Sequence, residues 1–397
     1  MKVLWFVSSL EQKGGGERFV QEAALALRAS GHDVVVVCDR LNLAASFDGH
    51  YDLSEVICTK QELKFKSGYA AKAFSKFRGI LCLGSTVRYH KPQLVICQSE
   101  FDAIKLYLLS RLLRFRYRVF VFGQMYQFKT DISRYSKIFR RHLNTIIASR
   151  PGYSETVIMP PPRLSLGVSL VNNIVSCLKY RALRKADRIF TVSNQVQWEV
   201  SIVYGCHSVV CRAAFDENYI DAQSIEHPRP LGRPIGLLSV SRLVDKKRID
   251  LIIAAFAACK LDATLTIIGT GPEEARLKEL GQGSSRAPQI IFLGPVSDIT
   301  LQREISKADC FISMDIGDYD ITVMEAMGKG LRAIVAADFD MTEFGDKFGG
   351  VVSVYPKIES LKVAIENIPY MAPPCASNVT ILKRLTWGSL ARTCISD

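Results

Sequence analysis

The chain has 397 residues, a formal net charge of +12 and a hydrophobic fraction of 48%. This length exceeds what one compact core supports and predicts two domains of ordinary size. The apolar fraction excludes a disordered chain, and no apolar run is long enough to span a bilayer.

Two features predict a cytosolic protein. Residues 1–7 are too short for a signal peptide and predict a first strand instead. The 11 cysteines are scattered without a Cys-x-x-Cys pair, as is typical of buried free thiols. We therefore expect no metal site and no cofactor.

Positive charge is concentrated in the first half of the chain, above all in residues 60–150, whereas the second half is nearly balanced. Such a cluster predicts an anionic partner: a membrane surface, a nucleic acid or a phosphorylated acceptor. Cations alternate with large apolar side chains in residues 64–66, 76–78 and 112–118. This mixture favours the headgroup region of an anionic membrane, with a merely solvated basic face as the alternative. No nucleic-acid-binding signature is present, so we expect no nucleic-acid partner.

The first forty residues predict a strand, a glycine-rich loop, a helix and a second strand, at residues 3–7, 14–18, 19–29 and 34–38. The second strand is a continuous β-branched run, as expected for a strand covered on both faces. This βαβ unit begins a doubly wound parallel sheet. Gly14, Gly15 and Gly16 lie where strand meets helix, and their backbone lets a ligand approach closely. A plain structural turn is the alternative.

Further strands are predicted at residues 94–97, 119–122 and 188–192, and a helix at 179–186. Polar side chains that follow such strands lie at the edge where doubly wound sheets bind ligands. The candidates at this edge are Gln98, Ser99, Gln124 and Ser193.

Residues 227–234 are rich in proline and predict a linker between domains at residues 1–226 and 235–376. Alternating strands and helices after it predict a second parallel α/β domain. The strands are predicted at 235–239, 264–268, 290–293, 310–313 and 333–335, with helices at 251–259, 273–280 and 299–306. Residues 377–397 predict a final helix. Two Rossmann-like domains of this kind leave a cleft at the carboxyl edges of their sheets.

An acidic loop and a short helix follow the predicted strand at residues 310–313. The helix begins near Thr322, carries Glu325 and ends at Gly330. A carboxylate near a helix N-terminus lies beside free backbone N–H groups, a pair suited to a ligand with hydroxyl and phosphate groups. A nucleotide-sugar is such a ligand, although an acid here is also an ordinary complement to the helix dipole.

A set of short motifs follows in order along the second half of the chain: Ser241-Arg242-Leu243 with Lys247, Gly269-Thr270-Gly271-Pro272-Glu273-Glu274, Phe292-Leu293-Gly294 before Ser297-Asp298, Ala308-Asp309-Cys310-Phe311-Ile312-Ser313, and Glu325-Ala326-Met327. The first half adds Gly14-Gly15-Gly16-Glu17-Arg18 and Ala186-Asp187-Arg188-Ile189 with Val192-Ser193. In order and spacing, this set closely resembles the retaining glycosyltransferases of family 4, which have the GT-B fold.

The resemblance implies roles for individual residues. Arg242 and Lys247 would hold the donor diphosphate and neutralise the leaving group. Glu325 would bind the ribose hydroxyls. The remaining positions implied to border the donor or acceptor are Gly14, Gly15, Gly16, Gln124, Ser193, Gly269, Gly271, Asp320, Ile321, Thr322 and Val323, the last three through backbone N–H groups.

The chain departs from the family pattern at several positions. Gly317 stands where the family has the first glutamate of a pair, and the nearby acids Asp318 and Asp320 are candidates to replace it. Asp320 itself replaces a glycine, and Arg248 replaces the glycine after the family's lysine. Gln124 stands where many members have a histidine.

The implied reaction is transfer of a sugar from a nucleotide-sugar to an acceptor hydroxyl, with retention at the anomeric carbon and without a metal. The expected acceptor is a glycan or lipid-linked glycan of cell-surface polysaccharide or lipopolysaccharide synthesis. The expected location is the inner face of the cell membrane. A nucleotide-sugar epimerase or phosphorylase on the same fold, and a degenerate binding protein without activity, are the alternatives.

Overall fold

The computed structural model describes residues 1–11, 15–42, 56–59, 69–122, 166–212, 214–228, 230–231, 234–316, 320–338 and 342–396. They form two compact units. The first contains the described parts of residues 1–122 and 166–212 together with residues 387–396, and the second contains those of residues 214–386. The predicted linker at residues 227–234 therefore lies within the second unit.

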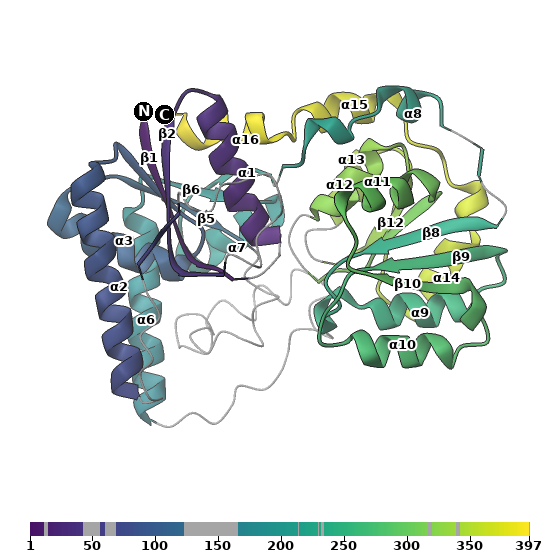
Figure 1. Cartoon of the computed structure of the whole chain (residues 1–397), viewed down its shortest axis with the longest axis horizontal. Coiled ribbons are helices and arrows are strands. Elements are labelled where there is room, and N and C mark those ends of the chain that lie inside the picture. Colours follow the sequence, from purple (N-terminus) through teal and green to yellow (C-terminus); the bar gives the residue numbers. More distant parts are fainter. Residues whose placement is uncertain are drawn as a thin grey trace. The chain divides into compact units, whose positions relative to one another are not determined.

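The first unit is built on a seven-stranded parallel sheet in the order β3-β2-β1-β4-β5-β6-β7 (Figure 1). The central parts of the longer strands are buried apolar runs, as expected where helices cover both faces of a parallel sheet. Their bounds are Lys2–Leu10 (β1), Asp33–Leu41 (β2), Ile57–Cys58 (β3), Leu94–Cys97 (β4), Tyr117–Val121 (β5), Arg188–Thr191 (β6) and Val209–Val210 (β7).

The helices of the first unit differ in extent from those predicted. Those before the second unit in the chain are α1 (Gly15–Ala29), α2 (Tyr69–His90), α3 (Glu100–Leu113), α6 (Leu166–Lys185) and α7 (Asn194–Tyr204) in the described residues. Gly15 and Gly16 were predicted in a loop, but they form the first turn of α1. Helices α2 and α3 were not predicted.

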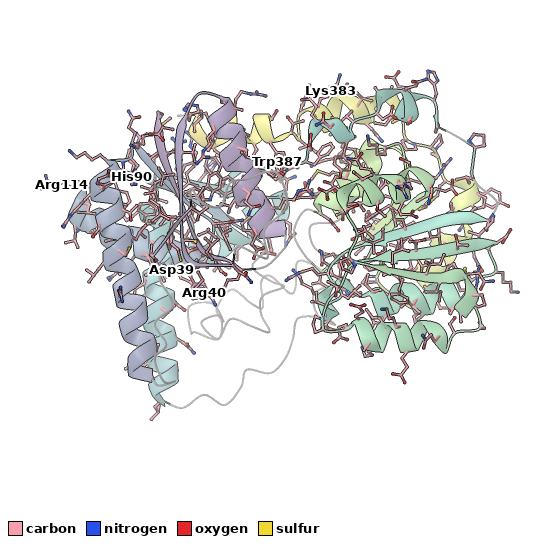
Figure 2. All side chains as sticks on the ribbon, viewed as in Figure 1. Asp39, Arg40, His90, Arg114, Lys383 and Trp387 are labelled. Atoms are coloured by element: carbon pink, nitrogen blue, oxygen red, sulfur yellow. The ribbon has the colours of Figure 1, made fainter. Side chains whose placement is uncertain are left out.

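The single helix predicted over residues 377–397 is wrong. The structure has α15 (Ala376–Lys383) in the second unit and α16 (Trp387–Ile395) in the first. Trp387, labelled in Figure 2, stacks edge-on against Phe19 of α1 at 5.9 Å between ring centroids. The buried Arg118 side chain donates from Nη1 to the carbonyls of Cys394 and Ser396 at 2.7 and 2.8 Å. These contacts fix α16 in the first unit.

The second unit is built on a six-stranded parallel sheet in the order β10-β9-β8-β11-β12-β13. Its strands are Ile235–Val240 (β8), Ala263–Ile268 (β9), Ile290–Gly294 (β10), Cys310–Ser313 (β11), Arg332–Ala336 (β12) and Val351–Val354 (β13). Its helices include α8 (Ala222–Glu226), α9 (Ile249–Ala258), α10 (Glu274–Gln282), α11 (Asp298–Lys307), α12 (Ile321–Gly328), α13 (Thr342–Lys347) and α14 (Ile358–Glu366), with a 3-10 turn, η6, at Asp245–Lys247.

Part of the predicted basic face belongs to the interior. Arg118 and Tyr117 are buried, and Arg118 pairs with Asp187 at 3.0 Å. The Lys105 ammonium pairs with Asp39 at 2.8 Å and with Asp102 at 3.3 Å. Residues 64–66 lie outside the described residues. Among the described helices, none combines the length and apolar character needed to cross a bilayer.

Candidate functional site

Most of the predicted site residues of the second unit lie at one place in its sheet. Strand β8 has β9 on one side and β11 on the other, and the chain order reverses between them. Such a switch point is where doubly wound sheets bind ligands. Arg242 and Lys247 follow β8, and Asp320 and Glu325 follow β11, so the topology brings these four residues to the same edge of the sheet.

The loops that follow β8 and β11 are tied together by charge and by backbone. The Lys247 ammonium forms a close ion pair with Oδ2 of Asp315. The Ile316 amide donates to the carbonyl of Lys246 at 2.8 Å. Burial alone would lower the pKa of Lys247, but the carboxylates of Asp315 and Asp320 outweigh it and raise this pKa above its usual value. Lys247 therefore stays charged, and Arg242 is exposed beside it.

Gly269 and Gly271 lie where the loop after β9 packs closely against the backbone of the loop after β8. Gly269 has φ +135°, and a β-carbon there would lie 1.8 Å from the carbonyl oxygen of Ser241. At Gly271 a β-carbon would lie 2.3 Å from the carbonyl oxygen of Leu243. Only glycine lets the loop after β9 approach the loop after β8 this closely. The two glycines therefore fix the backbone on either side of Arg242.

Asp320 is the N-cap of α12. Its Oδ1 accepts from the Thr322 amide at 3.1 Å and from the Thr322 hydroxyl at 2.7 Å. Its Oδ2 accepts from the Ser313 hydroxyl at 2.9 Å. The amide of Thr322, expected to face a phosphate, therefore already donates to a carboxylate of the chain itself. The neighbouring side chains of Ile321 and Val323 pack into the core.

Glu325 lies one turn into α12 and is 0% exposed. Removing a carboxylate from water completely is costly unless the fold provides for its charge. A core position chosen for packing alone would carry an apolar side chain, as the neighbouring Met324 and Ala326 do. Burial of this acid at the switch point is therefore consistent with a specific role.

A second ion pair holds the loop after β12 in place. Arg248 has the left-handed φ of +49° that explains why glycine is usual at this position. Its guanidinium donates to both oxygens of Asp338, at 3.1 and 2.7 Å. Burial raises the pKa of Asp338, and Arg248 opposes that rise. The bidentate contact offsets the strain of a non-glycine residue here.

Of the candidates in the first unit, Gly15, Gly16 and Gln98 lie at the corresponding switch point, between β1 and β4. Ser193 follows β6 instead, which β5 separates from β4. Gly15 and Gly16 begin α1, and the Gln98 amide donates from Nε2 to the carbonyl of Gly16 at 2.9 Å. The Ser193 hydroxyl is buried and accepts from the Val196 amide at 3.1 Å, which makes Ser193 the N-cap of α7. The predicted residues Gly14, Gln124 and Asp318 lie outside the described residues.

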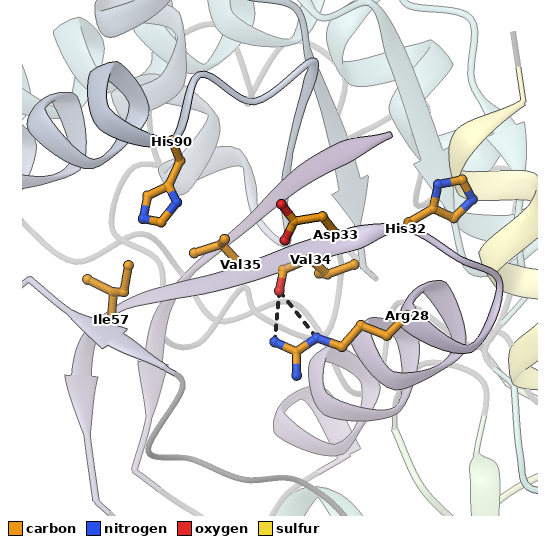
Figure 3. Close-up of a pocket in the computed structure, with 7 residues that line it drawn as sticks. All are labelled: Arg28, His32, Asp33, Val34, Val35, Ile57 and His90. Carbon is orange, nitrogen blue, oxygen red and sulfur yellow. Dashed lines mark hydrogen bonds between the residues drawn. The ribbon is translucent and has the colours of Figure 1, made fainter.

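A shallow cavity of about 450 Å³ lies elsewhere in the first unit (Figure 3). It opens at the amino end of β2, away from the carboxyl edge. The Arg28 guanidinium in this cavity already donates to the carbonyl of Val34. Its lining residues are Arg28, His32, Asp33, Val34, Val35, Ile57 and His90, and none is a predicted site residue. In the parts of the chain that the structure describes, no cluster of three histidine, cysteine or acidic side chains is arranged to hold a metal ion.

Comparison with known families gives a match within the second unit. Residues 222–368 match the family model described as glycosyl transferases group 1. This match includes all the predicted site residues that lie in the second unit.

Curated relatives match only part of the chain. The GtfA subunit of a UDP-N-acetylglucosamine–peptide N-acetylglucosaminyltransferase from Limosilactobacillus reuteri is 32% identical over 124 residues, covering 30% of this chain and 24% of the relative. An uncharacterized glycosyltransferase of Methanocaldococcus jannaschii is 23% identical over 197 residues, covering 46% of this chain and 50% of the relative. The matches thus span half of these relatives' length or less.

Solved structures match the whole chain in fold. Sucrose-phosphate synthase from Thermosynechococcus elongatus superimposes with a TM-score of 0.73 at 15% identity, covering 99% of this chain and 97% of that one. The Anabaena protein HepE in complex with UDP gives 0.66 at 16% identity, covering 99% and 98%. The lipopolysaccharide outer core galactosyltransferase WaaB gives 0.65 at 12% identity, covering 99% and 97%. The chain therefore has the GT-B fold of two Rossmann-like units.

Asp315 was not predicted as a site residue, and Asp338, in the Asp-x-Asp sequence at residues 338–340, was interpreted as part of a loop without a metal site. Both are acids that closely follow a buried strand, β11 or β12. Polar residues at that position formed the signal used for Gln98 and Ser193, and applied to the second unit it would have found both.

Proposed function

We propose that this chain is a glycosyltransferase that moves a sugar from a nucleotide-sugar donor to an acceptor hydroxyl, with retention at the anomeric carbon. One observation carries the proposal: Arg242 and Lys247 lie at the switch point of a unit that matches glycosyl transferases group 1. Two cations there suit the diphosphate of a nucleotide-sugar. The HepE structure with UDP supports a uridine donor as the first to test.

In the proposed reaction Arg242 and Lys247 hold the diphosphate while the bond between the anomeric carbon and its phosphate oxygen breaks. Their positive charge stabilises the departing diphosphate. The acceptor oxygen forms the new bond to the anomeric carbon, and its proton passes to an oxygen of the leaving phosphate. Glu325 would bind the ribose hydroxyls.

The acceptor we propose is a glycan or lipid-linked glycan used in cell-surface polysaccharide or lipopolysaccharide synthesis. The similarity in fold to a lipopolysaccharide galactosyltransferase supports this choice. Helices α3 and α6, which pack together, also expose apolar side chains in the basic first unit. The largest exposures are those of Leu112, Leu166, Leu170, Val171 and Ile174. We propose that these helices contact the anionic inner face of the membrane.

A second candidate is a nucleotide-sugar-binding protein that has lost activity. The charges of Arg242 and Lys247 are balanced by those of Asp315 and Asp320, and Asp320 occupies an amide at the start of α12. A crevice of this kind offers less net positive charge to a diphosphate than Arg242 and Lys247 alone would.

Two measurements test the proposal. A thermal-shift panel of UDP-, GDP- and ADP-sugars should give one ligand that stabilises the chain by about 2.7 kcal/mol at one hundred times its dissociation constant. With that donor, release of free nucleoside diphosphate should require an acceptor glycan. Binding without any release would favour the inactive binding protein. Conversion of the donor to another nucleotide-sugar without an acceptor would favour an epimerase.

A further inference from the structure

Asp315 holds a carboxylate oxygen that the fold does not use. The residue follows β11 directly and is 4% exposed. Its Oδ2 forms the ion pair with Lys247. Its Oδ1 is buried and accepts no hydrogen bond from any group in the described part of the chain. A buried acceptor without a donor is unfavourable, more so when it is charged.

The other acids of these loops differ in this respect. Both oxygens of Asp320 accept hydrogen bonds, in the cap of α12 and from Ser313. Both oxygens of Asp338 accept from Arg248. Of these three carboxylates, only that of Asp315 has an oxygen left for a ligand.

The position of this oxygen defines the chemistry of its partner. The carboxylate of Asp315 is in direct contact with the ammonium of Lys247. A ligand that satisfies both groups needs an O–H donor for Oδ1 and an anionic group a few bonds away for Lys247. A sugar joined to a phosphate has this arrangement, since its hydroxyls lie within one ring of the phosphoester oxygen.

We propose that Asp315 accepts a hydrogen bond from a hydroxyl of the donor sugar while Lys247 contacts the adjacent diphosphate, an inference that rests on the proposed function. Asp315 stands two residues before Gly317. It therefore supplies, from a different position, the carboxylate that Asp318 and Asp320 were expected to provide. Asp320 cannot do so without releasing the cap of α12.

The test compares a nucleoside diphosphate with its nucleotide-sugar by calorimetry, using the donor that binds the wild-type chain most tightly. The variant Asp315→Asn keeps the shape of the side chain but lacks the charge. We expect it to reduce the preference for the nucleotide-sugar over the bare diphosphate by about tenfold or more, the scale of a hydrogen bond to a charged group. The matched control is Asp338→Asn, a buried carboxylate whose oxygens are both occupied, and it should leave that ratio unchanged.

Donors in which single sugar hydroxyls are replaced by hydrogen make the test specific. One deoxy donor should bind the wild-type chain more weakly than the full donor does. On Asp315→Asn, the deoxy donor and the full donor should bind with equal affinity. A ratio that stays at the wild-type value in Asp315→Asn would overturn the assignment. If both affinities fell equally, the residue would only hold Lys247; if neither fell, it would not act on the ligand. If the wild-type chain bound no nucleotide-sugar in the panel, the proposed function itself would fall, and this inference with it.

Discussion

The substitution Gly269→Ala tests whether the loops at the switch point depend on glycine. The new β-carbon would lie 1.8 Å from the carbonyl oxygen of Ser241, a distance that no real contact allows. The backbone of residue 269 also has φ +135°, which an alanine adopts only with strain. The loop that carries Arg242 must therefore move or the strand end must deform.

The expected loss of stability is large. Backbone strain of this kind costs about 1–3 kcal/mol. Overpacking against a rigid carbonyl adds about 1–3 kcal/mol. A loss of roughly 2–6 kcal/mol compares with about 5–15 kcal/mol for a whole domain. With a urea dependence of about 1–3 kcal/mol per molar, the unfolding midpoint of the second unit should fall by roughly 1 M or more.

The chain allows the two units to be followed separately. Its 3 tryptophans, at positions 5, 198 and 387, all lie in the first unit. Far-ultraviolet circular dichroism should therefore show the early transition of the second unit, and tryptophan fluorescence should report the first. The control Gly283→Ala has φ −75° and a nearest contact of 3.5 Å, so its midpoint should not fall. An unchanged circular dichroism midpoint in Gly269→Ala would refute the steric reasoning.

Four further predictions concern the site and the surface. Arg242→Ala should lower kcat/KM by a loss of about 2–4 kcal/mol in transition-state stabilisation, with little change in the free energy of unfolding, because the side chain is exposed. Lys247→Ala should lower both kcat/KM and the free energy of unfolding, because it leaves the buried Asp315 without its cation. Equal denaturation midpoints for the two variants would contradict this. Arg248→Gly should destabilise the chain by about 2–4 kcal/mol in urea titrations, because losing the ion pair with Asp338 costs more than relieving the left-handed backbone gains. A variant more stable than the wild type would show that the backbone strain is the larger effect. Turnover should persist in EDTA, because Arg242 and Lys247 supply the positive charge, and activity lost in EDTA but restored by magnesium would refute that. The chain should sediment with anionic liposomes at low salt and be released at high salt. Equal sedimentation with neutral liposomes would show that the basic residues form a solvated face and do not bind an anionic membrane.

The strands of the second unit were predictable because parallel strands buried on both faces are continuous apolar runs. The predicted strand at residues 310–313 and the observed β11 coincide. Strand β13 was missed because its apolar run is short and is interrupted by Ser353. Helix α2 was missed because its cations and apolar side chains follow one another without a clear helical period.

The break between α15 and α16 depends on a contact that periodicity does not reveal. No glycine or proline interrupts residues 384–386. Instead, Phe215 and Thr386 form a parallel bridge, and the Phe215 amide donates to the carbonyl of Leu385 at 3.1 Å. These partners lie far apart in sequence, so only the folded chain brings them together. A local pattern therefore predicted one continuous helix where tertiary contacts impose two.

The chemistry of the site was predictable only in part, for the same reason. Motif order identified Arg242, Lys247 and Glu325 as candidates and sheet topology brings them to one edge. Which carboxylate oxygens remain available depends on distances across loops. Asp320 was a candidate to contact the sugar, yet its oxygens bind Thr322 and Ser313. Asp315 was not predicted as a site residue, because a single acid after a strand is a weak signal.

Two described departures from the family pattern, at positions 248 and 320, replace a glycine with a charged residue. At position 248 the left-handed conformation typical of glycine persists, and the added guanidinium holds Asp338. At position 320 the helix start persists, and the added carboxylate caps it. Both added charges therefore already have partners within the chain. Since Oδ1 of Asp315 has no such partner in the described residues, a donor sugar suited to this site should be one whose hydroxyls reach that atom rather than position 317.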